Sequence, residues 1–259
     1  MSRWPWLCPS CQRGKSAEEM ETAGRTCCVT QRIDTTQRTF GLRWRGGCAN
    51  VCGDMEPDSP HLRGALIVFE GIDGTGKSTH IQLLARYLRG LGIEVVTDFE
   101  PTRGPWGMKV REAAMSGQRL SLEEEIDCLL QDRREHVRNF IEPALAEGKW
   151  VLLDRYYLSM MAYQGASGAN VEEIRECNEA FATVPDVAFW MDIPVEMSID
   201  RMKQRGNAAD AFENEPFLMA CAAIYSSMEM PWLHRIEADG SIAEVHARVR
   251  DVLREELGV

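Results

Sequence analysis

The sequence lacks any apolar run that approaches the roughly 18 residues of a membrane-spanning helix. It also lacks the apolar core of a secretory signal peptide near its start, internal repeats and low-complexity tracts. Basic residues are outnumbered, because 29 lysines and arginines face 40 acidic residues, for a net charge of −11 at pH 7. This balance disfavours nucleic acid or an anionic membrane as the main partner. The 259 residues suffice for one large domain with a substantial core, so the composition favours a soluble enzyme.

Cysteine is scarce outside the N-terminal region, where six of the nine cysteines occur: Cys8, Cys11, Cys27, Cys28, Cys48 and Cys52. The other three, Cys128, Cys177 and Cys221, lie singly in helical patterns, where cysteine usually acts as a small buried hydrophobe. We therefore expect a reducing, cytoplasmic setting.

The first 60 residues differ in character from the rest of the chain. They show little apolar periodicity, and up to Asp54 eight basic residues face five acidic ones, so this stretch carries a net charge of +3 and the remainder −14. The pairs Cys8–Cys11 and Cys48–Cys52 could form a zinc site, although the second spacing is looser and the gap between the pairs is long. Three glutamates among residues 18–21 disfavour a mitochondrial presequence. The composition indicates that residues 1–60 form a disordered or non-native extension and that residues 61–259 form the domain. A product starting at Met55 would contain this whole domain.

A glycine-rich motif, G-x-x-x-x-G-K-S, follows the apolar run 65–69 and precedes apolar residues at helical spacing from Ile81 onward. A strand, a loop and a helix in this order are the setting of the phosphate-binding P-loop. Its backbone N–H groups converge on phosphate oxygens, Lys77 reaches the β- and γ-phosphates, and the Ser78 hydroxyl binds Mg²⁺. The residues expected to bind ATP are Gly71, Ile72, Asp73, Gly74, Thr75, Gly76, Lys77, Ser78 and Thr79.

Strand and helix patterns alternate after the P-loop. Further strands are expected at 94–99, 151–153, 187–191 and 233–238, and helices at 110–115, 122–146 and 242–257. This order predicts an α/β fold of the P-loop NTPase type, a three-layer sandwich in which helices cover both faces of a five-stranded parallel sheet. The strand at 151–153 stops on Asp154, where the carboxylate on the Mg²⁺ side belongs. Asp192, at the end of another strand, is expected to order a loop.

These segments resemble the thymidylate kinase family. The resemblance rests on the P-loop as Phe69-Glu70-Gly71-Ile72-Asp73-Gly74, on Asp154-Arg155-Tyr156 with Ser159, and on Ala162-Tyr163-Gln164-Gly165. Residues 132–137, 190–194 and 201–206 are similar to the family's acceptor-binding segment, fourth strand and lid. The resemblance runs from about Leu66 to the C-terminus. It implies transfer of a phosphate from ATP to dTMP, with Mg²⁺, by a homodimer that binds small nucleotides.

The resemblance also assigns roles to residues. It places Asp73 at the acceptor's 3′-hydroxyl, Arg133 and Gln164 in the acceptor site, Arg155 between donor and acceptor, and Tyr163 against a 2′-hydroxyl. Because Gly74 stands where some members carry an arginine, a catalytic cation is expected from Arg205 in a lid over residues 203–215. The acceptor phosphate is a dianion near neutral pH, since its second pKa is about 6, so positive charge is needed more than a base. The expected catalytic residues are Lys77, Asp154, Arg155 and Arg205.

Four positions depart from the family pattern. Phe99 replaces a common arginine, Leu129 a phenylalanine that stacks on thymine, Met160 a polar residue at the base, and Ala211 a second lid arginine. A kinase for another deoxynucleoside monophosphate therefore stays open, as does a nucleotide-dependent regulatory protein with a zinc-binding N-terminal module. Arg134 and Arg138 are expected to be solvated, whereas Arg103 and Arg111 could contact either phosphate or solvent.

Overall fold

The computed structural model describes residues 64–204 and 215–259. The cysteine pairs of the N-terminal extension, Met55, Arg205 and Ala211 lie outside these residues, as does most of the expected lid. Among the described residues, no helix is both long and apolar enough to cross a bilayer.

Five parallel strands form one sheet in the order β2-β3-β1-β4-β5. Their bounds are β1 Leu66–Glu70, β2 Val95–Phe99, β3 Trp150–Asp154, β4 Val187–Asp192 and β5 Leu233–Glu237. The central strand β1 pairs with β3 through Leu66 and Val151 and with β4 through Ile67 and Val187. The chain runs from β1 to β2 on one side and later to β4 on the other, so the order reverses beside β1. Ligands of open parallel sheets bind at such a switch point, outside the carboxyl ends of the strands.

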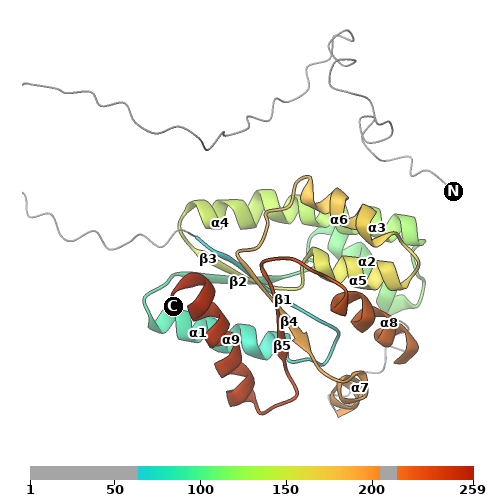
Figure 1. The fold of residues 1–259 in the computed structure, drawn as a ribbon. Helices are drawn as coiled ribbons and strands as arrows, with labels where there is room; N and C mark the ends of the chain where they lie inside the picture. The colour runs from blue at the N-terminus through green and yellow to red at the C-terminus, as the bar shows by residue number, and fades with distance from the viewer. Residues whose placement is uncertain (1–63, 205–214) are drawn as a thin grey trace, which may run out of the picture. The chain divides into compact units, whose positions relative to one another are not determined.

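Two helices, α1 (Lys77–Gly90) and α9 (Ile242–Leu257), cover one face of the sheet (Figure 1). Strand side chains point alternately to the two faces, and those of Ile67, Phe69, Leu152 and Phe189 belong to the same buried cluster as apolar residues of these helices. The burial of this cluster joins the P-loop helix firmly to the sheet.

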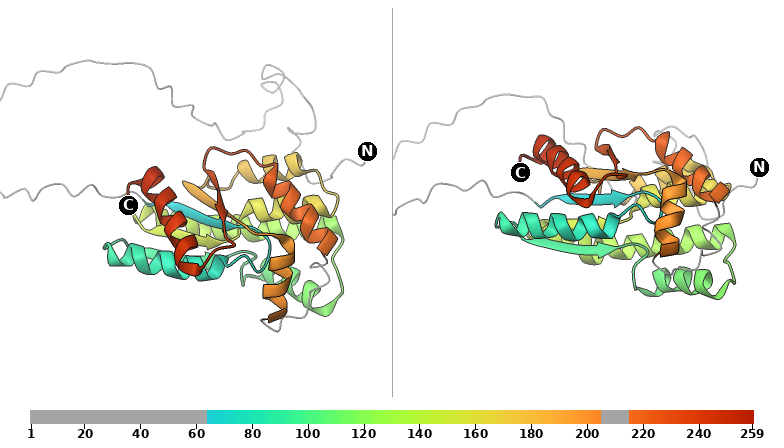
Figure 2. Two further views of the ribbon diagram at one scale, coloured as in Figure 1. Left: turned by 60° about the horizontal axis from the view of Figure 1, so that its bottom comes forward. Right: turned by 90° about the horizontal axis from the view of Figure 1, so that it is seen from below.

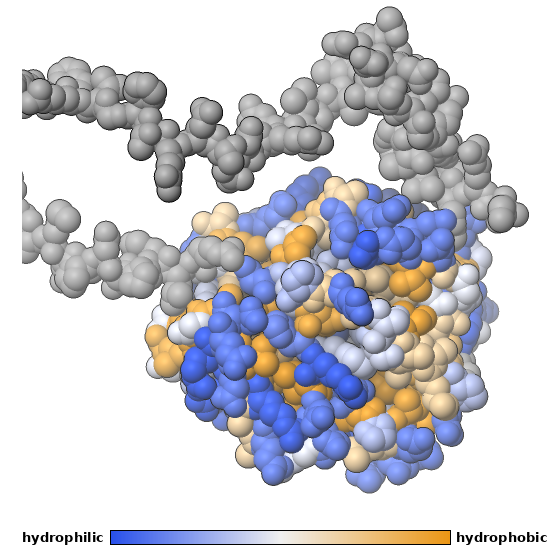
Figure 3. Space-filling model, viewed as in Figure 1, coloured by the Kyte–Doolittle hydropathy of each residue, from blue (hydrophilic) through white to orange (hydrophobic). Residues whose placement is uncertain are grey.

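The opposite face is covered by α3 (Leu122–His136), α4 (Glu142–Ala146), α5 (Tyr157–Ala166), α6 (Val171–Glu179) and α8 (Glu215–Ser226) (Figures 1 and 2). The remaining helices are α2 (Pro105–Ser116), which packs on α3, and α7 (Val195–Gln204). In Figure 3, hydrophilic residues cover much of the lower left of this face, over α1 and α9, and part of its upper right. The predicted three-layer fold with a five-stranded parallel sheet is thus confirmed.

One predicted helix is divided in the structure. Residues 122–146 form α3, a π-helical turn η2 (Val137–Ile141) and α4, not one regular helix. A proline inside an α-helix clashes with the carbonyl four residues earlier, which for Pro143 is Asn139. The wider turn covers Asn139 and is thus placed to relieve this clash. The predicted helix is thus confirmed over its whole length, and apolar spacing does not report that one turn is wound more widely.

Candidate active site

The P-loop spans the six residues between β1 and α1, as the sequence predicts. Gly74 has φ of 78°, and a Cβ atom built there would lie 2.7 Å from the carbonyl oxygen of Ser198. The Ser198 hydroxyl donates a hydrogen bond back to the carbonyl oxygen of Asp73, which keeps α7 against the loop. A side chain at position 74 would therefore meet the backbone of α7, so the glycine of this sequence fits the loop.

Lys77, the first residue of α1, lies inside the loop. Its Nζ donates hydrogen bonds to the carbonyl oxygens of Gly71 at 3.0 Å and Ile72 at 2.8 Å. Burial, together with repulsion from Arg155, lowers the pKa of Lys77 to about 8. Phosphate oxygens close to this ammonium group would favour its charged form.

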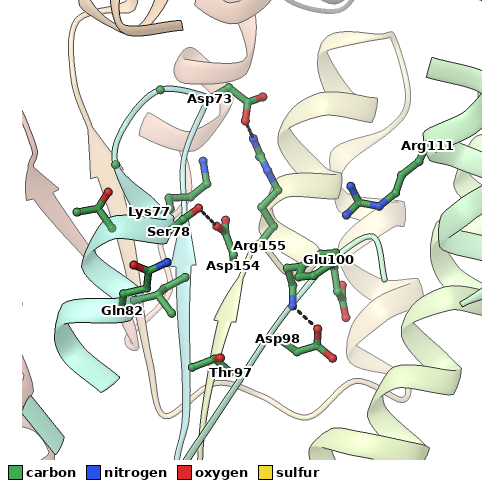
Figure 4. A pocket seen from close by; sticks show the side chains of 15 residues that line it. Asp73, Lys77, Ser78, Gln82, Thr97, Asp98, Glu100, Arg111, Asp154 and Arg155 are labelled. Carbon is green, nitrogen blue, oxygen red and sulfur yellow. Dashed lines mark hydrogen bonds and ion pairs between the residues drawn. The ribbon is translucent and has the colours of Figure 1, made fainter. Parts of the chain in front are cut away.

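Ser78 and Asp154 meet at the base of the loop. The Ser78 hydroxyl donates to Oδ2 of Asp154 at 2.5 Å, and Asp154 ends β3 beside β1 (Figure 4). Hydroxyl and carboxylate oxygens are the ligands that Mg²⁺ prefers, and one or two protein ligands with substrate phosphates are its usual set. The two residues expected to hold Mg²⁺ are therefore adjacent, and their donor atoms fit the ion.

Arg155 lies between the P-loop and α5. Its backbone has φ of 72°, which is uncommon for a residue with a side chain. The guanidinium group donates to the Gly71 carbonyl oxygen at 3.1 Å, to Oγ of Ser159 at 3.0 Å and to Oδ1 of Asp73 at 2.6 Å. Its position is therefore set by groups from two segments of the chain, the P-loop and α5, before any substrate binds.

Asp73 and Tyr163 face each other beside Arg155. The Tyr163 hydroxyl donates to Oδ2 of Asp73 at 3.1 Å and accepts from Nη2 of Arg155 at 3.1 Å. Burial disfavours the charged carboxylate, but Arg155 and Lys77 outweigh it and hold the pKa of Asp73 well below its usual range. Asp73 is thus an ionised acceptor that can receive a hydrogen bond from a hydroxyl group.

A buried carboxylate, Glu70, supports this arrangement from below. It accepts hydrogen bonds from Oγ of Ser159 at 2.5 Å, from the Tyr225 hydroxyl at 3.1 Å and from the Tyr156 backbone N–H at 2.9 Å. Burial raises the pKa of Glu70. Glu70 therefore ties β1 to α5 and α8 and holds the Ser159 hydroxyl against Arg155.

These groups open into a cavity of about 540 Å³ at the carboxyl ends of the strands (Figure 4). The predicted site residues that line it are Asp73, Gly74, Gly76, Lys77, Ser78, Thr79, Asp154 and Arg155. Gly71, Ile72, Thr75, Arg133, Tyr163 and Gln164 are not among its lining residues. A second cavity of about 510 Å³ adjoins it and shares Asp98 and Phe99 with it.

Arg133 lies behind the cavity. Its guanidinium group donates to Oε2 of Glu100 at 2.8 Å and to Oδ1 of Asn178 at 2.6 Å, and its Nη1 lies 3.4 Å from Sδ of Met160. Gln164 is also buried, with its amide 3.3 Å from a carboxylate oxygen of Glu125. Glu100, and not Arg133, lines the cavity.

Arg111, for which the sequence left phosphate and solvent open, lines the cavity. The sequence did not indicate the following lining residues as part of the site: Gln82, Thr97, Asp98 and Glu100. Three of them lie at or just past the carboxyl end of β2, which pairs with β3 so that Phe99 is opposite Asp154. The signal that could have found them is the sheet order, since adjacent parallel strands bring their carboxyl ends to one edge.

A P-loop on a parallel sheet of this order, with a serine–aspartate pair and arginines at one cavity, defines a P-loop nucleotide kinase. The sequence model of the thymidylate kinase family matches residues 69–249. The chain is 58% identical over 191 residues to a thymidylate kinase of Akkermansia muciniphila, with 74% of this chain and 92% of the relative covered. It is 46% identical to one of Desulfotalea psychrophila (73% and 93% covered) and 44% identical to one of Xylella fastidiosa (74% and 94% covered). The chain therefore belongs to the thymidylate kinase family, and membership of a kinase family implies the use of ATP.

Proposed function

We propose that this protein transfers the γ-phosphate of ATP to the 5′-phosphate of dTMP in the cytoplasm, giving ADP and dTDP. The observation that carries this proposal is the position of Arg155, which contacts the P-loop carbonyl of Gly71 and the acceptor-side Asp73 with one guanidinium group. A cation in this position can stabilise charge on both nucleotides during transfer.

The donor side uses the loop and the first turn of α1. Backbone N–H groups and Lys77 bind the β- and γ-phosphates, and Lys77 exchanges its loop carbonyl partners for phosphate oxygens. Ser78 and Asp154 would hold Mg²⁺, which neutralises charge on the β- and γ-oxygens when bound.

The acceptor side needs no strong base. With a second pKa of about 6, the 5′-phosphate of dTMP is a dianion at neutral pH and can attack directly. The obstacle is repulsion between two polyanions, which Arg155 and Arg111 reduce from the cavity and Arg205 from the lid over residues 203–215. The lid would close over the phosphates and exclude water before transfer.

The sugar of the acceptor lies against Asp73 and Tyr163 in this proposal. The ionised carboxylate of Asp73 accepts a hydrogen bond from the 3′-hydroxyl, and the Tyr163 ring occupies the space of a 2′-hydroxyl. The base lies toward Leu129, Met160, Arg133 and Gln164, of which Arg133 and Met160 are in contact. This region is buried and combines two apolar side chains with two polar ones, in keeping with a nucleobase.

The test is ADP release by the full chain with ATP and Mg²⁺ against dTMP, dUMP, dCMP, dGMP and dAMP. Strong preference for dTMP supports the proposal, and EDTA should abolish turnover. Arg155→Ala should lower kcat by about 10²–10³-fold. Arg138→Ala is the control, since Arg138 is exposed and, within residues 64–204 and 215–259, forms its side-chain hydrogen bond with the neighbouring Asn139. Preference for another monophosphate would overturn the choice of dTMP and point to Leu129 and Met160, and no turnover would favour a regulatory role.

The family resemblance further supports a homodimer. Light scattering of the full chain in solution tests this proposal, because a monomer and a dimer of 29.2 kDa chains differ twofold in mass.

A further inference from the structure

Phe99 stands at the border of the two cavities. It ends β2, beside the P-loop cavity, and its side chain lines both cavities. The thymidylate kinase family commonly carries an arginine here, so this chain lacks a cation at a place where two anionic nucleotides are expected to meet.

The ring of Phe99 compensates by contacting two other arginines. The Cζ atom of Arg111, from α2, lies 4.9 Å from the ring centroid, and that of Arg103, from the preceding loop, lies 5.5 Å away. Guanidinium groups within about 6 Å of an aromatic ring are attracted by its π electrons. One aromatic side chain thus orients two cations.

Arg111 is held at a second point as well. Its Nε donates to the carbonyl oxygen of Pro101 at 3.0 Å, and its Nη2 donates to the same oxygen. Arg103, in contrast, has no hydrogen bond to any residue of 64–204 or 215–259; within this part of the chain it contacts the ring and interacts with the carboxylate of Asp98.

The charges point to an anion between these groups. Figure 4 shows Arg111 and Arg155 entering the cavity from different elements. Burial lowers the pKa of Arg111, and although Asp132 opposes this effect, repulsion from Arg103 and Arg155 adds to it. A doubly charged phosphate placed between Arg111 and Arg155, which line the same cavity, would relieve this repulsion.

We propose that Phe99 is a positioning residue for the acceptor phosphate: its ring holds Arg111 at the edge of the P-loop cavity, so that Arg111 converges with Arg155 on that phosphate, while Arg103, on the same ring, lines the adjoining cavity. The proposal rests on the function proposed above. Phe99 contacts no reacting atom. Its ring restricts two long side chains before the substrate binds, so less side-chain entropy is lost on binding.

The kinetic test compares Phe99→Leu with Phe99→Tyr. The leucine variant removes the π face and should raise KM for dTMP about tenfold, with KM for ATP changed less than twofold. The tyrosine variant keeps the ring and should stay within twofold of the wild type. Phe140→Leu is the matched control, because Phe140 lines the second cavity but stacks on His136 and not on an arginine.

A double-mutant cycle with Arg111→Lys tests the coupling. Lysine lacks the planar guanidinium group, so Phe99→Leu should raise KM for dTMP less in this background than in the wild type. Equal effects in both backgrounds, or an equal rise of KM in Phe99→Leu and Phe140→Leu, would overturn the proposal.

A measurement without catalysis separates this proposal from the proposed function. In ¹⁵N-labelled wild-type protein, the Nε–H signals of Arg103 and Arg111 should be shifted upfield by the ring current, and Phe99→Leu should remove the shift while Phe99→Tyr keeps it. Unshifted signals in the wild type would contradict the positioning role of Phe99 even if dTMP is the substrate. Shifted signals with no dTMP turnover would instead reject the function and leave the arrangement of the arginines standing.

Discussion

Glu100 and Arg133 form an ion pair that is almost completely removed from solvent. Nε and Nη2 of Arg133 lie 2.8 Å and 2.7 Å from Oε2 of Glu100, and each side chain is 3% exposed. The other carboxylate oxygen of Glu100 lies 2.8 Å from Nδ1 of His136, one turn further along α3. One carboxylate from the end of β2 therefore binds two side chains of α3 and fixes the wall between the cavity and the helix.

Glu100→Gln should destabilise the protein strongly. The amide keeps the shape but leaves Arg133 buried without its negative partner and His136 with Asp98 alone, and breaking such a buried pair costs about 3–5 kcal/mol in the free energy of unfolding. Urea denaturation at pH 7 measures it. The control is Glu94→Gln, whose carboxylate contacts Lys149 from a side chain that is 70% exposed and should contribute little. A loss as small as that of the control would show that the pair is not needed for stability.

His136 should stabilise the protein most at neutral and acid pH. Burial disfavours its charged form, but Asp98 and Glu100 outweigh burial and raise the pKa of His136 to about 9. A raised pKa adds stability that is complete below the unfolded value of about 6.5 and is lost as the pH rises through 9. His136→Gln should therefore be less stable than the wild type by up to about 3 kcal/mol at pH 6, with the difference shrinking toward pH 10. Urea denaturation across this range checks it, and a constant difference would contradict it.

His80 should have the opposite effect in a different pH window. It lies on α1, is 4% exposed, stacks on His246 of α9 and has an Nδ1 atom without a hydrogen-bond partner among the described residues. Burial, His246 and Arg201 lower the pKa of His80 to about 4. Since His80 is harder to protonate in the folded state, its contribution to the free energy of unfolding is complete above pH 6.5. This contribution is lost as the pH falls toward 4.

The variant His80→Gln isolates this loss, since it cannot take up a proton. Between pH 7 and pH 4.5 it should lose less free energy of unfolding than the wild type, by about 2–3 kcal/mol. Parallel loss in the two proteins would mean that acid acts through other groups, such as His246 or the carboxylates.

The parts of the site that could be predicted from the sequence are those that local geometry determines. The P-loop is readable because phosphate binding demands glycines, a lysine and a serine at fixed spacing between a strand and a helix. Asp154 and Arg155 are readable because an apolar strand ends on them. Both predictions place the residues at the cavity that the structure contains.

Contacts between segments that are far apart in the sequence could not be predicted in this way. Glu100 and Arg133 are 33 residues apart, and nothing in either segment indicates that burial joins them. The resemblance assigned Arg133 to the acceptor and said nothing of a carboxylate partner, and that acceptor role stays a prediction. Phe99 was noticed only as a missing arginine, because the two guanidinium groups beside its ring come from the following loop and from α2.

Gly74→Ala should disable the P-loop through steric conflict, beyond the strain of its backbone. A Cβ atom at Gly74 would lie 2.7 Å from the Ser198 carbonyl oxygen, and φ of 78° adds strain of about 1–2 kcal/mol for alanine. Gly117→Ala is the matched control, since Gly117 has a similar φ of 68° but no atom within 4 Å of its Cβ position. Both variants should be less stable than the wild type, because alanine is strained at a positive φ. Only Gly74→Ala should also lose ATP binding, as measured by calorimetry. If both variants bind ATP as the wild type does, α7 can move away from the loop at little cost, and glycine is not required at position 74.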